Sequence, residues 1–271
     1  MGHNDTYKSD YEVNKEYWDA RVNVHMLSDF YKMEEFRKGA SSLCETEVLE
    51  IGSVSGKSLC HLQCHFGQDT LSWARMGAKV TGLDLSPEGI KHAQALSSEL
   101  DIPASFVLGN VLDASSCIQN RFDIVFTSYG TIIWLHDLHR WAEQISALLK
   151  PGGVFYIIDF HPVAWMFDEK LEKIKYSYFN VDPIVELTTG SYANKEADLQ
   201  KTCITWNHSL AEITGALIQS GLRLEFLHEF GFSWYNVFEN LVSRTPAAGG
   251  FIHREHGEKI PLMFSIKATK A

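Results

Sequence analysis

The sequence predicts an α/β fold in which a doubly wound parallel sheet carries an inserted antiparallel lid. Short apolar runs alternate with helical patterns from residue 58 to residue 159. A tight glycine turn follows the first of these runs, and an acid stands about 20 residues later at the tip of the second. Residues 163–206 then alternate between aromatic and polar stretches, which is typical of an inserted antiparallel segment.

The composition narrows the class of protein. The chain has 271 residues and is 45% hydrophobic, enough for one large domain or two small ones. A net charge of -10 argues against nucleic acid or membrane as a partner, because both favour basic patches. The N-terminus lacks a signal peptide's apolar region, and no apolar run approaches the ~20 residues of a membrane span. Five cysteines, an odd number, favour reduced thiols and a cytoplasmic location, and the oligomeric state stays open.

The N-terminal residues 1–50 read as a helical arm. We expect a loose segment over 1–13 and a helix over 14–29, where Tyr17, Trp18, Val22 and Met26 have helical spacing. A second helix is expected over 34–40. A turn over 52–57 then leads into the first strand.

The stretch from residue 58 to residue 86 reads as strand, turn, helix, strand and acid. The first strand is expected over 59–63, and Gly67 stands where the chain must turn sharply into a helix. That helix covers 70–76 and ends at Gly77. The second strand, 79–83, delivers Asp84 to the carboxyl edge of the sheet. An acid at this position accepts hydrogen bonds from a ribose, so we predict a nucleoside-binding unit.

The remaining elements complete the alternating pattern. Ser86 and Pro87 begin a helix that reaches residue 100. Further strands are expected over 105–108, 122–127 and 154–159, with a helix over 138–149 and a turn over 150–153. In the lid we expect strands over 176–179, 184–188 and 202–206. After it we expect a helix over 207–219 and strands over 222–230 and 260–269, joined by a long connection over 231–259.

The turn itself indicates the ligand. A dinucleotide fingerprint has three glycines, and the second lets the backbone approach a pyrophosphate. Here residues 63–67 contain one glycine, and the side chain of His65 would obstruct a pyrophosphate. An adenosine ligand without phosphate is tolerated better, and S-adenosylmethionine is such a ligand.

Five motifs in order resemble the class I S-adenosylmethionine-dependent methyltransferases, in a bacterial subgroup of unassigned substrate. They are HLQCHFGQDT (61–70), VTGLDLS (80–86), GNVLD (109–113), FDIVFTSYG (122–130) and LLKPGGVFYIIDF (148–160). The resemblance implies a Rossmann-like seven-stranded sheet whose last strand is antiparallel. It implies a single methyltransferase domain with a cofactor-binding core over 57–161, a lid over 163–206 and a C-terminal helix and strands over 207–271.

The resemblance also assigns roles in the turn. Gln63, His65 and Gly67 stand at the three glycine positions of the family's loop, with Cys64 between the first two. The backbone of Gln63 is expected to meet the methionine amino group of S-adenosylmethionine. The family's usual acid is replaced by His61, so the sequence leaves open how that amino group is held.

Further roles follow along the carboxyl edge. The resemblance implies that Asp84 takes the ribose hydroxyls and that Leu85 packs on adenine. Asn110 stands where the family usually has Asp, and its amide oxygen can accept a bond from the adenine amine. A turn asparagine is the alternative. The backbone of Val111 is expected at the ring edge. The residues expected to face the methionine end are Ser128 and Tyr129.

Aromatic residues are candidates for the walls of the site. A sulfonium cation is attracted to aromatic faces, which suits Trp18, Tyr31, Tyr129 and Trp134. A place in the core is the alternative for each. Tyr31 gains support because an N-terminal arm commonly folds over the cofactor in the family.

The catalytic residue is the least determined part of the prediction. Methyl transfer needs mainly alignment and desolvation, although a hydroxyl or amine acceptor also needs a base. His161, after the fifth strand, lies nearest the crevice, and a structural histidine is its alternative. The other candidates are His136 and His208. We expect no metal site, because no second pair of ligands accompanies the Cys and His residues of 60–65 at a known spacing.

The sequence therefore predicts methyl transfer from S-adenosylmethionine to a small-molecule acceptor. An aromatic lid suits a closed pocket better than a groove for a polymer. An oxidoreductase of the NAD type is one rival, disfavoured by the missing glycines. A non-catalytic S-adenosylmethionine-binding protein is the other, because the turn departs from the family at residues 61, 63 and 65.

Overall fold

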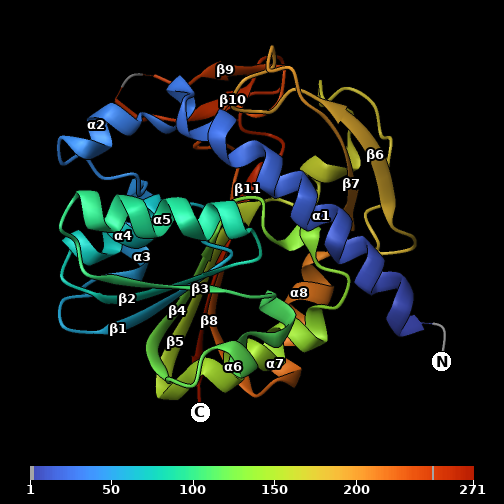
Figure 1. The fold of residues 1–271 in the computed structure, drawn as a ribbon. Helices are drawn as coiled ribbons and strands as arrows, with labels where there is room; N and C mark the ends of the chain where they lie inside the picture. Colours follow the sequence, from blue (N-terminus) through green and yellow to red (C-terminus); the bar gives the residue numbers. More distant parts are fainter. Residues whose placement is uncertain (1–2, 246) are drawn as a thin grey trace.

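A seven-stranded sheet forms the centre of the computed structural model, which describes residues 3–245 and 247–271 (Figure 1). Its order is β3-β2-β1-β4-β5-β11-β8. The strands are β1 (Ser58–Leu62), β2 (Lys79–Asp84), β3 (Ala104–Leu108), β4 (Phe122–Ser128), β5 (Leu149–Phe160), β8 (Leu222–Phe230) and β11 (Met263–Lys270). Strands β1 to β5 pair in parallel, whereas β11 is antiparallel to both of its neighbours. The predicted Rossmann-like sheet with an antiparallel last strand is confirmed.

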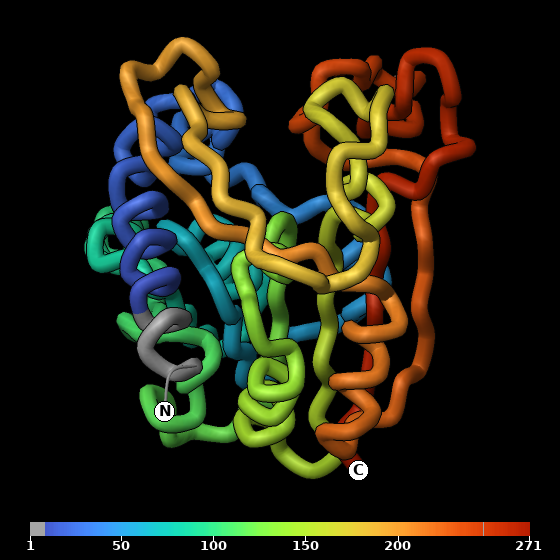
Figure 2. The backbone as a smooth tube through the Cα atoms, turned by 90° about the vertical axis from the view of Figure 1, so that its right-hand side faces the viewer, coloured from blue at the N-terminus to red at the C-terminus, as the bar shows by residue number. Residues whose placement is uncertain are grey.

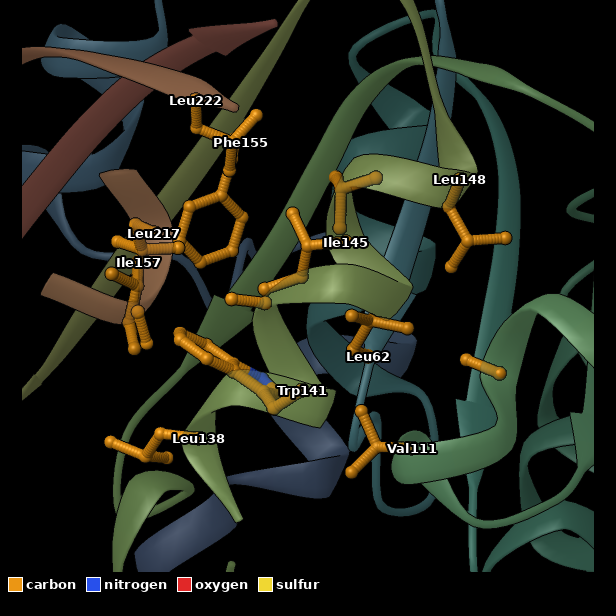
Figure 3. Packing of buried hydrophobic residues seen from close by; sticks show 14 of the residues in the cluster. Leu62, Val111, Leu138, Trp141, Ile145, Leu148, Phe155, Ile157, Leu217 and Leu222 are labelled. Carbon is orange, nitrogen blue, oxygen red and sulfur yellow. The ribbon is translucent and has the colours of Figure 1, made fainter. Parts of the chain in front are cut away.

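Helices cover both faces of the sheet, so its central strands are apolar on both sides. One face carries α3 (Glu45–Ile51), α4 (Gln68–Arg75) and α5 (Pro87–Glu99), and the other carries α6 (Ala114–Cys117), α7 (Leu138–Leu148) and α8 (Leu210–Gln219) (Figure 1). Trp141 and Leu217 pack with Phe155 of β5 in the second layer, all of them fully buried (Figure 3).

Local signals set most helix ends where the sequence predicted them. The Ser86 hydroxyl accepts a hydrogen bond from the Gly89 amide at 2.9 Å, and Pro87 occupies the first turn of α5. Gly77 follows α4 with a φ of 92°. Helix α3 was not predicted; it begins with a capping box between Cys44 and Glu47. The 3-10 helices are η1 (Asp29–Tyr31), η2 (Val111–Asp113), η3 (Ile132–Trp134) and η4 (Ala164–Met166).

The prediction of a loose arm over 1–13 is wrong for the part that the structure describes. Helix α1 runs from His3 to Met26, while Met1 and Gly2 lie outside the described residues. At the expected start of the helix, the side chain of Asn14 exchanges hydrogen bonds of 2.7 and 2.9 Å with the backbone of Ile204. Such tertiary contacts support a helix whose own sequence signal is weak. Helix α2 (Met33–Arg37) follows.

The lid contains fewer strands than predicted. Strands β6 (Ile184–Thr189) and β7 (Gln200–Thr205) pair as an antiparallel hairpin that runs alongside α1 (Figure 2). Residues 176–179 form no strand, and the Tyr176 hydroxyl instead bonds to Glu186 of β6. A second small sheet pairs β9 (Leu241–Ser243) with β10 (Phe251–His253). No helix in the described part of the chain combines the length and the apolar composition that crossing a membrane requires.

Candidate active site

Three strand ends meet at one edge of the sheet and define the site. Strands β2 and β4 flank β1 in parallel, so their carboxyl ends lie together. Gln63 follows β1, Asp84 ends β2 and Ser128 ends β4. The structure therefore brings these predicted residues to the same edge.

The turn after β1 keeps a glycine-loop backbone with other residues in it. Gln63 has a φ of 57° and His65 a φ of 51°, both in the left-handed region that glycine favours. Each costs roughly 1–2 kcal/mol of strain. Gly67 has a φ of 78°, and a Cβ there would lie 2.6 Å from the ring of Phe106. Only glycine fits that last position, and the backbone of the other two follows the glycine pattern.

Asp84 is anchored by backbone amides. Its Oδ2 accepts from the His65 amide at 2.7 Å and its Oδ1 from the Ser86 amide at 2.9 Å. Burial raises the pKa of the carboxyl to about 6, and the amide donors oppose that rise. Each carboxylate oxygen accepts more than one hydrogen bond, so both keep capacity for ribose hydroxyls.

The residues predicted around adenine lie next to this edge. The Asn110 side-chain oxygen accepts from the Leu112 amide at 3.0 Å and caps η2, as its alternative role required. The Val111 side chain is buried in the core, so only its backbone is available for the predicted contact with the adenine ring edge. Leu85 is partly buried beside Asp84. Contacts of these residues with adenine stay predictions.

Two carboxyl groups that sequence reasoning missed contact Ser128 and Tyr129, the residues predicted to face the methionine end. Asp69 accepts from the Ser42 hydroxyl at 2.6 Å and from the Ser128 hydroxyl at 3.3 Å. Glu47 accepts from the Tyr129 hydroxyl at 2.7 Å. Each had a sequence signal: Asp69 lies in the first turn of the helix after the glycine turn, and Glu47 has the spacing of a capping box.

Burial changes the ionisation of both groups. It raises the pKa of Asp69 to about 6, against the two hydroxyl donors that lower it. It raises the pKa of Glu47 to about 8, so that this side chain holds a proton at neutral pH. The predicted methionine end therefore contains one carboxylate and one neutral carboxylic acid.

Aromatic side chains from distant segments enclose the site. The Tyr31 hydroxyl of η1 bonds to the Tyr192 hydroxyl, next to the hairpin. The ring centroid of Trp18 lies 5.1 Å from that of Trp134 and 5.4 Å from that of His65. Tyr129 packs 4.8 Å from Tyr235. Trp18, Tyr31 and Trp134, all predicted as wall residues, share this enclosure.

His65 is held by a histidine of α1. The two nitrogens His25 Nδ1 and His65 Nε2 are 2.8 Å apart, and His25 Nε2 lies 2.6 Å from the Ser191 hydroxyl. Burial lowers the pKa of His25 to about 3, so its imidazole is neutral. His25 therefore links the turn after β1 to the β6–β7 hairpin.

Both ring nitrogens of His161, the predicted base, have hydrogen-bond partners. Its Nε2 lies 2.8 Å from Glu229 and its Nδ1 accepts from the Val163 amide at 3.1 Å. The His208 ring likewise bonds to the Leu135 carbonyl and contacts Glu212. His136 is half-buried, and burial lowers its pKa. A base role for any of these three histidines stays a prediction.

Cys60 and Cys64 are buried free thiols, as expected. Burial raises the pKa of both. His61 between them is buried too; its Nδ1 lies 2.8 Å from the Thr70 hydroxyl, and burial lowers its pKa to about 3. The position of the family's usual acid is therefore neutral in this chain.

The donors and acceptors of the site fit S-adenosylmethionine. Asp84 offers a buried carboxylate to a ribose, and the Oε1 atom of Gln63 is buried without a hydrogen-bond partner at the methionine end. The His65 ring lies where a dinucleotide loop would have glycine. This set matches an adenosine with an amino-acid tail and offers no cradle for a pyrophosphate.

Comparison with known proteins agrees with this geometry. A family described as a methyltransferase domain matches residues 48–153. An uncharacterised methyltransferase of Synechocystis sp. is 30% identical over 118 residues, 41% of this chain and 51% of that protein. A ubiquinone biosynthesis O-methyltransferase of Proteus mirabilis is 31% identical over 166 residues, 54% of this chain and 67% of that protein. Across the curated relatives as a group, the chain spans about half of their length.

Solved structures share the fold. The crystal structure of an S-adenosylmethionine-dependent methyltransferase from Mesorhizobium loti matches with a TM-score of 0.55 at 16% identity, over 86% of this chain and 100% of that chain. At this identity the likeness concerns the fold alone. Fold and site together define a class I methyltransferase. The chain belongs to the S-adenosylmethionine-dependent methyltransferases, and S-adenosylmethionine is its cofactor.

Proposed function

We propose that this protein transfers the methyl group of S-adenosylmethionine to a small-molecule acceptor. The observation that carries the proposal is the enclosure of the carboxyl edge by aromatic side chains from α1, η1, η3 and the lid. Aromatic side chains packed over the strand ends suit a small molecule, whereas a polymer needs an open groove. The net charge of -10 also disfavours a nucleic-acid acceptor.

The residues of the site would act mainly by aligning the reactants and by excluding water from them. S-adenosylmethionine supplies an electrophilic methyl group on a sulfonium. Asp84 would fix the ribose, and the rings of Trp18, Tyr31 and Trp134 would face the cationic end and exclude water. Alignment of this kind can supply a large part of the rate gain in an in-line displacement. The proposal needs no proton transfer by His161.

We also propose that the protein works in the cytoplasm. All five cysteines are free, and three of them are buried. Free thiols are typical of a reducing compartment.

Thermal unfolding with excess S-adenosylmethionine, S-adenosylhomocysteine or NADH tests the cofactor. A ligand at about 100 times its dissociation constant adds about 2.7 kcal/mol and raises the melting temperature by several degrees. We expect this rise with both S-adenosyl compounds. A rise with NADH alone would favour an oxidoreductase. Transfer of labelled methyl to a panel of small hydroxyl, amine and thiol acceptors then tests catalysis, and binding without any transfer would favour a non-catalytic protein.

A further inference from the structure

Asp69 is a partly buried carboxylate without a cationic partner among the described residues. Its hydrogen bonds come from two neutral hydroxyls, Ser42 and Ser128. The titratable groups that interact with it are all acids, namely Cys44, Glu47, Tyr31 and Tyr235. A carboxylate out of water is costly unless a cation is paired with it. A cationic ligand would complete the charge balance of this end of the site.

A second acceptor lies at the same edge. The Gln63 amide nitrogen donates to the Thr131 carbonyl at 3.1 Å, while its Oε1 is buried and has no hydrogen-bond partner. Gln63 follows β1 and Ser128 ends β4, the strand next to β1. A buried acceptor of this kind calls for a donor from a ligand. The two acceptors together suit a group that carries several N–H donors and a positive charge.

We propose that Asp69 binds the α-ammonium group of S-adenosylmethionine and that the side-chain oxygen of Gln63 is its second acceptor. This assignment rests on the proposed function. It resolves the departure at His61, whose buried and neutral ring offers no charge to an ammonium. The carboxylate has moved from β1 to the first turn of α4, two residues after Gly67. An ammonium has three donors, and its hydrogen bonds to a carboxylate are charge-assisted.

Binding of S-adenosylhomocysteine to Asp69→Asn tests this assignment by titration calorimetry. The matched ligand is an analogue in which hydrogen replaces the α-amino group, and 5′-methylthioadenosine lacks the whole amino-acid tail. We expect Asp69→Asn to weaken S-adenosylhomocysteine by roughly 10- to 100-fold and to leave the two other ligands within about twofold. Asp123→Asn is the control, because Asp123 lies at the amino end of β4, away from the site. It should change none of the three affinities.

The outcomes separate this inference from the proposed function. If the unmodified protein does not bind S-adenosylhomocysteine, the proposed function fails. If it binds and Asp69→Asn binds equally well, only the assignment of Asp69 fails. A variant that keeps this affinity but loses methyl transfer would also overturn it, since Asp69 would then act on the acceptor. Equal weakening of all three ligands would show a structural role instead.

The unmodified protein offers a test that needs no variant. Burial raises the pKa of Asp69 to about 6, so its charge is lost as the pH falls through that value. The ratio of the affinities for S-adenosylhomocysteine and its deaminated analogue should therefore fall several-fold between pH 7.5 and pH 5, as a charge-assisted bond is lost. Asp84 has a similar pKa, but it faces the ribose that both ligands share, and its titration cancels in the ratio. A constant ratio would contradict the assignment.

Discussion

The two halves of the site are built in different ways. Around β1, β2 and β4 the polar contacts run largely through the backbone, as in the amides that hold Asp84. The enclosing half, from α1 to the β6–β7 hairpin, is held by side chains. Tyr31 and Tyr192 meet there although they lie 161 residues apart. Backbone contacts depend little on side-chain identity, so the first half keeps its geometry for one cofactor. Side-chain contacts change with substitution, so the enclosing half can be adapted to a different acceptor.

Loss of charge at Asp84 should have the largest effect and should break the cofactor half alone. Asp84→Asn removes the ionised acceptor and places an amide donor near the amides of His65 and Ser86. We expect the affinity for S-adenosylhomocysteine to fall about 100-fold, equivalent to about 2.7 kcal/mol, by titration calorimetry. Asp123→Asn is again the control. Unchanged affinity in Asp84→Asn would contradict the ribose assignment.

A variant of Glu47 tests the contact between the two halves, because the Glu47 side chain of α3 accepts a hydrogen bond from Tyr129. Its pKa is raised by burial to about 8, above the value of 4.5 expected when unfolded. Between these values the native state keeps a proton that the unfolded state has released, so stability falls as the pH rises. The slope is at most about 1.4 kcal/mol per pH unit and disappears above the folded pKa.

Glu47→Gln should remove that slope. The raised pKa values of Asp69 and Asp84 act in the same direction, but only up to about 6. We therefore expect urea unfolding at pH 6, 7 and 8 to show a smaller loss of stability in Glu47→Gln than in the unmodified protein. Parallel pH profiles would mean that Glu47 is ionised in the folded state.

The enclosing half should loosen when its link to the turn is cut. Ser191→Ala removes the buried hydrogen bond to His25. A bond of this kind contributes about 1 kcal/mol, so amide exchange in β6 and β7 should become about 5-fold faster. The affinity for 5′-methylthioadenosine should stay the same. Ser177→Ala, at an exposed lid position, serves as the control, and equal exchange rates in both variants would contradict the link.

The smallest expected effect concerns the backbone of the turn. Gln63 has a φ of 57°, where glycine avoids the strain that alanine suffers. Gln63→Gly should therefore be more stable to urea than Gln63→Ala by about 1 kcal/mol. Gln94, inside α5 and exposed, is the matched control, where alanine should be favoured by about 1 kcal/mol. The same order at both positions would contradict the strain at Gln63.

The sequence predicted what depends on local signals. The cap at Ser86, the turn at Gly67 and the place of Asp84 each follow from a few neighbouring residues. The sheet order followed from the resemblance to a family. Gln63, His65 and Asp84 were predicted to lie together for the same reason, since they belong to one continuous strand–turn–helix–strand unit.

Asp69 and Glu47 had local sequence signals, but their withdrawal from solvent could not be predicted, because an acid on a short helix is usually exposed. Their burial depends on Ser42, Ser128 and Tyr129, which come from other parts of the chain. Helix α1 extends beyond its expected start for a related reason, since contacts such as that of Asn14 with β7 support it. Long-range contacts of this kind leave little trace in a single sequence.

The link from His65 through His25 to Ser191 bears on the order of events in a catalytic cycle. A cofactor held between Asp84 and the turn after β1 lies on the sheet side of this link. Its departure would require the hairpin tip to move away first. We therefore expect an ordered sequential mechanism in which S-adenosylmethionine enters before the acceptor and S-adenosylhomocysteine leaves last.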